Sequence, residues 1–76
     1  SYGADGLIQA KFDIVGFQVK LPTGASLSVK GDRFDNKTLA AIKKLKQGNT
    51  INLMYIKAKG PDGKEIQLRG LPIELN

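Results

Sequence analysis

The fold is decided by residues 11–30, which read KFDIVGFQVKLPTGASLSVK. Apolar and polar side chains alternate on both sides of Gly16, but the alternation changes phase there, because Ile14 and Phe17 both belong to the apolar set. A strand keeps both of these residues on one face only if it holds one extra residue, which is a β-bulge. Glycine suits the backbone of a bulge. The pattern therefore predicts a bulged strand over residues 11–21 whose two halves face the same core.

A hairpin follows this strand. Residues 22–25 read PTGA, which is typical of a tight turn with proline at its second position. After the turn, Leu27 and Val29 alternate with serine and lysine. This alternation predicts a second strand with one face toward solvent, which ends near Gly31 and Asp32.

One helix is predicted over residues 37–46. Its apolar side chains recur at every third position: Leu39, Ile42 and Leu45. Asp35 or Asn36 can accept the free N–H groups of the first turn. At the other end, Lys46 suits the negative end of the helix dipole and Gly48 supplies a left-handed cap. About three turns are too few for a stable isolated helix, so we expect all three apolar residues to pack on the sheet.

Two more strands are predicted after the helix. Residues 50–58 carry apolar side chains on both faces of a strand, with Ile51, Leu53 and Tyr55 on one face and Met54, Ile56 and Ala58 on the other. Such a strand is expected to be central in its sheet. The GPDG turn at residues 60–63 leads to a last strand whose apolar phase slips at Gly70. Pro72 has no N–H to donate, which indicates that this half of the strand lies at a sheet edge or has its N–H position turned to solvent.

Residues 11–76 are predicted to form one mainly β (α+β) domain with the order strand, strand, helix, strand, strand. The two bent hairpins favour a small immunoglobulin-like β-sandwich with one short helix. The alternative is a β-grasp arrangement, in which a single mixed sheet wraps the helix. The first residues are mostly small or polar, and we expect residues 1–10 to be a linker or an expression remnant.

Composition restricts what the domain can do. The chain has 76 residues and contains neither cysteine nor histidine, so it has no disulfide, no thiolate or imidazole metal ligand and no histidine base. A chain of this size buries only about 60% of its unfolded surface. Support from an oligomer partner or from neighbouring domains therefore fits the small core. No apolar run approaches the ~18 residues that a membrane-spanning helix needs.

The sequence holds no recognisable catalytic motif. No serine stands in a Gly-x-Ser-x-Gly elbow, no glycine-rich phosphate loop opens a helix, and the acidic residues are too sparse for a calcium loop. Asp32 beside Arg33 is the one candidate pair for ligand chemistry, and a turn or local ion pair is the simpler interpretation. We therefore expect a binding domain and not an enzyme, with no catalytic residue, metal or cofactor.

The candidate protein contacts are charged side chains in two places. In the last hairpin and the strand after it they are Lys57, Lys59, Asp62, Lys64, Glu65 and Arg69, and on the helix they are Lys43, Lys44 and Lys46. The net charge of +5 and the helix lysines also permit a small basic nucleic-acid-binding module. That reading is the alternative, because the other basic residues form no stripe along the chain.

Four segments resemble the C-terminal domain of the GldM/PorM family of the Bacteroidetes gliding-motility and type IX secretion machinery. They are residues 28–32 (SVKGD), 45–49 (LKQGN), 56–63 (IKAKGPDG) and 71–73 (LPI), and the similarity covers residues 17–76. The resemblance implies a periplasmic β-sandwich-like domain at the far end of a dimeric rod that is anchored in the inner membrane.

The resemblance also implies a mechanical role without catalysis. The partners that it implies are other proteins of the apparatus, including an outer-membrane-associated lipoprotein ring, and a second copy in a homodimer. Nucleic acid is not among them, and this segment is not expected to insert into a membrane. The transmembrane helix and stalk of the family are not in this sequence, so we expect either a segment of a longer protein or a stand-alone relative.

Overall fold

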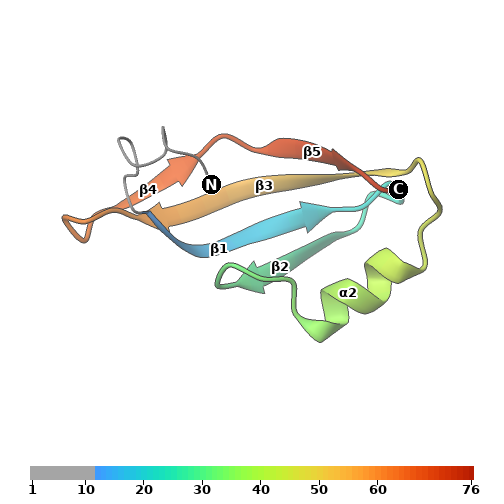
Figure 1. Ribbon diagram of the computed structural model, residues 1–76, viewed down its shortest axis with the longest axis horizontal. Helices are drawn as coiled ribbons and strands as arrows, with labels where there is room; N and C mark the ends of the chain where they lie inside the picture. The colour runs from blue at the N-terminus through green and yellow to red at the C-terminus, as the bar shows by residue number, and fades with distance from the viewer. Residues whose placement is uncertain (1–11) are drawn as a thin grey trace.

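The computed structural model describes residues 12–76 (Figure 1). Its elements in chain order are β1 (Asp13–Lys20), β2 (Ser26–Lys30), α2 (Asn36–Lys43), β3 (Thr50–Lys59), β4 (Glu65–Leu68) and β5 (Leu71–Glu74). The predicted order of elements is confirmed, except that the last predicted strand is divided into two short strands. The linker predicted over residues 1–10 lies outside the described residues.

All five strands belong to one sheet. The strand order is β2-β1-β3-β4, and β5 also pairs with β3, so β3 is the central strand, as predicted. The four ladders are antiparallel. The mainly β class with one short helix is confirmed, and the arrangement is consistent with a small β-sandwich or α+β fold. The mixed sheet of the β-grasp alternative is not found in the part of the chain that the structure describes.

The bulge predicted in β1 is present, and a second bulge in β3 compensates for it. Two steps along β1, from Ile14 to Gly16, correspond to one step along β3, so Val15 is the extra residue. Between Gly16 and Gln18 the reverse holds, because β3 advances by one residue more than β1. In that part of β3, Tyr55 adopts a φ of 48°. The two irregularities cancel, so the β1–β3 pair presents the same two faces at both of its ends.

The β3 bulge changes which side chains of that strand share a face. Residues directly opposite each other on a ladder point to the same side of the sheet. Met54 and Lys57 pair with β1 residues that share a face, although they are three positions apart. The intervening phase change moves Ile56 and Ala58 away from the face of Met54, so the prediction that these three share a face is wrong. We call the face of Met54 and Lys57 the outer face, and the opposite one, which holds Ile56 and Ala58, the inner face.

Strands β4 and β5 are two parts of one edge strand. Both pair with β3 in a single register that runs without a shift from Lys59 to Thr50. The interruption at Gly70 confirms the predicted phase slip. A Cβ on Gly70 would collide with the carbonyl oxygen of Leu53, so only glycine fits beside β3 at this point. Pro72 lies in β5, which pairs only with β3, and the predicted edge position is confirmed.

The helix α2 ends at Lys43, three residues before the predicted end. Its last turn tightens, because the N–H of Leu45 donates to the carbonyl of Ile42 at 2.9 Å. Gly48 does have a positive φ, of 93°, but it is not the helix cap. Its N–H donates instead to the carbonyl of Leu75 at 2.8 Å and ties the turn before β3 to the C-terminal end of the sheet.

The core on the inner face is small. Its buried apolar side chains are Val19, Val29, Ile51, Ile56 and Ala58. Ile42 and Leu45 pack against part of it, but Leu39 is 37% exposed and Thr38 is buried instead. The predicted packing of Leu39 is wrong because a spacing of three residues drifts by about 60° around a helix at each step. Figure 1 shows α2 beside the β2 edge and not across the centre of the sheet, so the helix covers only one side of the inner face.

The start of α2 gives a prediction about acid stability. Asp35 is the N-cap, and its Oδ1 accepts a hydrogen bond from the backbone N–H of Thr38 at 2.8 Å. The Thr38 hydroxyl, and after it this N–H, lowers the pKa of the Asp35 carboxyl below its ordinary 3.8. A carboxyl whose pKa falls on folding stabilises the fold above its unfolded pKa and loses that contribution as the pH falls through the folded pKa.

We therefore expect the melting temperature of the wild-type chain to fall more steeply below pH 4 than that of Asp35→Asn. Asparagine is also a good N-cap but carries no titrating carboxyl, so the two chains should melt at similar temperatures at pH 7. Circular dichroism melts at several pH values measure the difference. Parallel pH profiles for the two chains would contradict the assignment of Asp35 as a titrating cap.

Candidate protein-binding surface

The nine charged residues predicted as contacts are all exposed, but they form two separate groups. Figure 1 shows the turn between β3 and β4 at one end of the long axis of the molecule and α2 toward the other. The hairpin group comprises Lys57, Lys59, Asp62, Lys64, Glu65 and Arg69, and the helix group comprises Lys43, Lys44 and Lys46. Asp62 shapes its own turn, since its Oδ1 accepts the N–H of Lys64 at 2.9 Å. The structure does not unite the nine in one site, and their role in binding stays a prediction.

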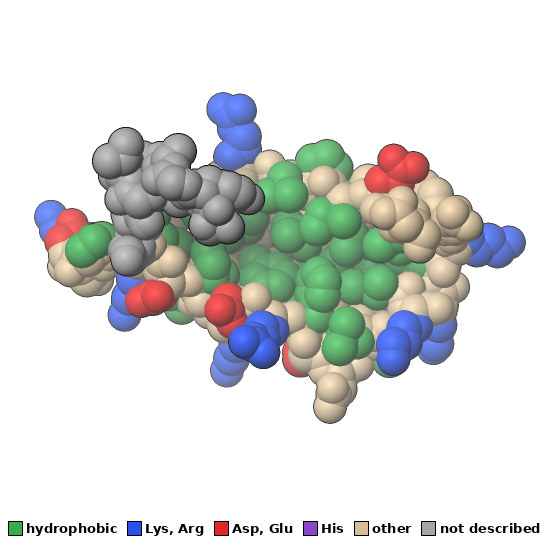
Figure 2. Space-filling model, in the orientation of Figure 1, with side chains coloured by type: hydrophobic (Ala, Val, Ile, Leu, Met, Phe, Trp, Pro, Cys, Tyr) green, Lys and Arg blue, Asp and Glu red, His purple; other side chains and the backbone are tan. Residues whose placement is uncertain are grey.

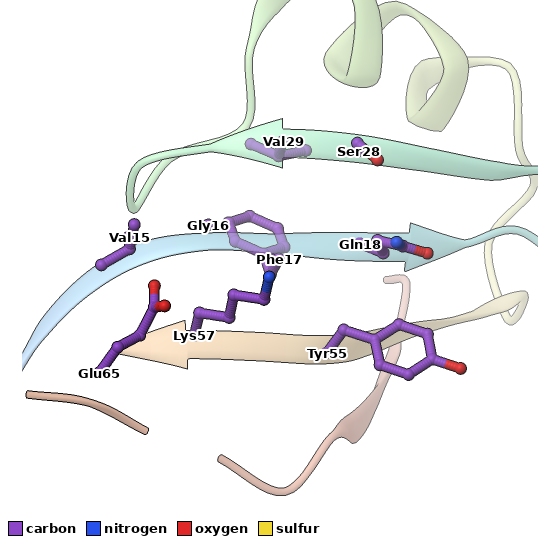
Figure 3. A pocket seen from close by; sticks show the side chains of 9 residues that line it. All are labelled: Val15, Gly16, Phe17, Gln18, Ser28, Val29, Tyr55, Lys57 and Glu65. Atoms are coloured by element: carbon purple, nitrogen blue, oxygen red, sulfur yellow. The ribbon is translucent and has the colours of Figure 1, made fainter. Parts of the chain in front are cut away.

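Two of these residues, Lys57 and Glu65, line a hollow of about 270 Å³ (Figure 3). Gly16 lies between the lysines of two neighbouring strands, because its ladder partners are Lys30 on β2 and Lys57 on β3. A Cβ on Gly16 would lie 3.0 Å from the carbonyl oxygen of Val29, which is closer than the backbone allows without a shift. Glycine therefore keeps the floor of this hollow bare.

Tyr55 stands on the other side of the same hollow. Figure 3 shows its ring at one end and the side chains of Lys57 and Glu65 at the other. The φ of 48° puts Tyr55 in the left-handed region, which costs a non-glycine residue about 1–2 kcal/mol. The side chain is 50% exposed, so burial in the core does little to offset this strain. Residues with a strained backbone cluster at functional sites. Tyr55 is therefore a candidate functional residue of this surface.

A second hollow, of about 320 Å³, adjoins the first. It is lined by Lys20 of β1, by Asn52, Leu53 and Met54 of β3, and by Gly70, Leu71 and Pro72 of the edge strand. Met54 pairs with Gln18, which lines the first hollow, so the two hollows meet at this pair. Most of the lining side chains belong to the outer face, which is the face without the helix. We call the two hollows together the outer groove.

Three of the four lysines around the outer groove lack acidic neighbours on the ladders. These three, which have only uncharged ladder partners, are Lys20, Lys30 and Lys57. The acids Asp13 and Glu65 both pair with a fourth lysine, Lys59. None of the four lysines forms a salt bridge within residues 12–76. The groove is therefore bordered by positive charge that the neighbouring strand positions leave uncompensated.

Asp32 and Arg33 are not part of the groove. They form an exposed ion pair in which Nε of Arg33 lies 3.8 Å from Oδ1 of Asp32, and exposed pairs of this kind contribute little. Neither residue lines either hollow. Between residues 12 and 76, no cluster of three or more acidic side chains is placed to hold a metal ion. Among the same residues, no helix has the length and apolar character needed to cross a membrane.

Comparison with known proteins adds one finding. A family model described as the GldM C-terminal domain matches residues 4–76, which is nearly the whole chain. No curated protein matches the chain.

Proposed function

Because the chain belongs to the GldM C-terminal domain family, we propose that it is a non-catalytic periplasmic assembly domain. This family is a component of the gliding-motility and type IX secretion machinery. Its task is to connect an inner-membrane-anchored protein to other proteins of the apparatus, including an outer-membrane-associated lipoprotein ring. Membership of this family supports the assignment to the machinery. The exposed surface of the sheet supports the assignment of the contact to one of its faces.

The observation that carries the proposal is that residues 12–76 cover the inner face incompletely. Ile66 and Leu71 pair with inner-face residues of β3, yet they are 40% and 45% exposed. Figure 2 shows hydrophobic side chains gathered over the middle of the molecule, with lysine and arginine at the margin. The radius of gyration is 14.0 Å, where a compact chain of this length has about 11 Å. A flat domain with exposed apolar side chains gains stability when a partner covers them, at about 25 cal/mol per Å².

The edges of the sheet favour contact through the face. β2 is only five residues long and carries serine and lysine. The opposite edge is interrupted at Gly70, and Pro72 offers no N–H there. Short, charged or proline-containing edges discourage a partner from adding a strand. We therefore assign the apparatus contact to the inner face around Ile66 and Leu71.

Photo-crosslinking in cells tests this assignment. A photo-reactive amino acid at Leu71 or Ile66 of the full-length protein is expected to yield adducts with an envelope protein of the apparatus. The same amino acid at Thr23, an exposed position in the turn between β1 and β2, serves as the control and is expected to yield little. Equal yields at the three positions, or no adduct from the inner face, would argue against the proposed contact.

A second copy of the chain is a further candidate for the inner face, in keeping with a homodimer. An adduct of twice the subunit mass from Leu71 would identify that arrangement, and a light-scattering mass of the purified chain would show whether it persists in solution. Detection of both adducts would place the homodimer and the apparatus contact on the same face.

A further inference from the structure

We propose that the outer groove binds an extended segment of a partner protein whose groove-facing side chains are alternately apolar and acidic. The proposal deepens the assembly function above and rests on it, because it gives the chemistry of one partner segment. It concerns the outer face. Leu71 also lines the second hollow, whereas Ile66 lines neither hollow and so reports on the inner face alone.

The shape of the groove fits an extended segment. Along β1 it runs from Gly16 to Lys20, which is about 13 Å of strand. The two hollows offer apolar lining, with Val15 in the first and Met54 and Pro72 in the second. In an extended chain, residues i and i+2 point to the same side. Positions i and i+4 of one segment, about 13 Å apart, can thus place an apolar side chain in each hollow.

The charges of the groove favour an acidic residue at position i+2, which faces the groove between those apolar side chains. Lys57 lines the first hollow and Lys20 the second, and the ladder partners of both are uncharged. Gln18 and Ser28 add neutral hydrogen-bonding groups to the first hollow. Glu65 is the one acid of the lining, and it pairs with Lys59 on the ladder. Complementary charge across an interface selects the partner and guides its approach.

Tyr55 gives the groove its central contact. Its ring is half exposed and lies beside the point where the two hollows meet. The bulge that holds it re-aims the side chain away from the regular strand positions, as bulges near binding sites do. Tyrosine is enriched among the residues that contribute most of the binding energy of protein interfaces. The strained backbone of Tyr55 is explained if the ring serves a partner and not the core.

Fluorescence anisotropy with a synthetic peptide tests the proposal. The probe is a fluorescein-labelled peptide of about ten residues, long enough to span both hollows, in which every second residue is serine and the positions between alternate leucine with glutamate. The same peptide with lysine in place of glutamate and a thymine oligonucleotide of about ten nucleotides are the comparison probes. We expect the glutamate peptide to bind the 76-residue chain at least about tenfold more tightly than either comparison. Equal binding of the lysine peptide, or tighter binding of the oligonucleotide, would overturn the proposal.

A matched pair of double variants locates the binding. Lys20→Gln with Lys57→Gln removes two charges from the groove, and Lys43→Gln with Lys46→Gln removes two from the helix end. We expect the groove variant to lose about tenfold in affinity and the helix variant at most about twofold. Equal losses would mean that the net charge, and not the groove, attracts the peptide.

Tyr55→Asn separates binding from folding. Asparagine adopts the left-handed region more readily than tyrosine, so the melting temperature should stay equal or rise while peptide affinity falls about tenfold. Unchanged affinity in this variant would refute the role of the ring. If the photo-crosslinks form from the inner face but no acidic peptide binds the groove, only the present inference fails and the assembly function stands.

Discussion

Gly70→Ala is expected to lower the free energy of unfolding by about 3 kcal/mol. The added Cβ, which is fixed directly to the backbone between β4 and β5, would meet the backbone carbonyl oxygen of Leu53 in β3. Neither can move away as the end of a flexible side chain can, so the edge strand must shift from β3. The loss is measurable by urea unfolding followed by circular dichroism.

Gly24→Ala is the control for this change. Gly24 lies in the turn between β1 and β2 with a φ of 98°, and a Cβ there would meet nothing within 4 Å. Its replacement should cost only the left-handed backbone term, about 1 kcal/mol. If Gly24→Ala proves as destabilising as Gly70→Ala, the close approach of the edge strand to β3 is not what demands glycine at position 70.

Ile51→Ala is expected to cost about 3–4 kcal/mol and to leave the chain largely unfolded at 25 °C. Ile51 is only 1% exposed and lies on the central strand, in a cluster with Val19 and Val29. Few neighbouring side chains can move in to fill the cavity that its removal would leave. A single small core rarely supplies more than about 3–5 kcal/mol, so one such loss removes most of the stability.

Leu39→Ala provides the comparison on the helix. Leu39 carries the same number of side-chain carbons as Ile51 but is 37% exposed, so its truncation should cost less than about 1 kcal/mol. Chemical unfolding of both variants under the same conditions gives the two values. A cost for Leu39→Ala close to that of Ile51→Ala would show that the helix packs more centrally than at the β2 edge.

Local signals in the sequence were reliable for the bulge in β1 and for the interruption at Gly70. Both are changes of phase beside a glycine, and both can be read within a few residues. The sequence of β3 also contains a change of phase, but a less distinct one. Asn52 is polar between two apolar residues, and further on the polar positions are Lys57 and Lys59, which belong to the other phase. Tyr55 is apolar enough to fit either phase. The pattern of residues 50–58 therefore predicts a strand covered on both faces and does not reveal the bulge.

The candidate site was less predictable than the fold. Lys57 and Glu65 are predicted from the sequence as protein contacts, and both line one hollow together with Tyr55. These residues lie along one groove with Gly16 and Lys20 because of the register between β1 and β3, which pairs residues far apart in the chain. No local sequence pattern predicts that register. The exposure of the Tyr55 side chain depends on the residues packed around it, so the sequence does not predict it either.

By itself, the sequence determined the order of elements, the two hairpin turns, the central place of β3 and the edge position of Pro72. Each of these depends on backbone preferences or on apolar periodicity, which act over a few neighbouring residues. The tertiary structure alone shows that the bulges at Val15 and Tyr55 cancel, that the helix lies at the β2 edge, and that the rest of the described chain, residues 12–76, leaves part of the inner face uncovered. These outcomes depend on which strands pair and in what register, and pairing is a long-range choice that local preferences permit but do not specify.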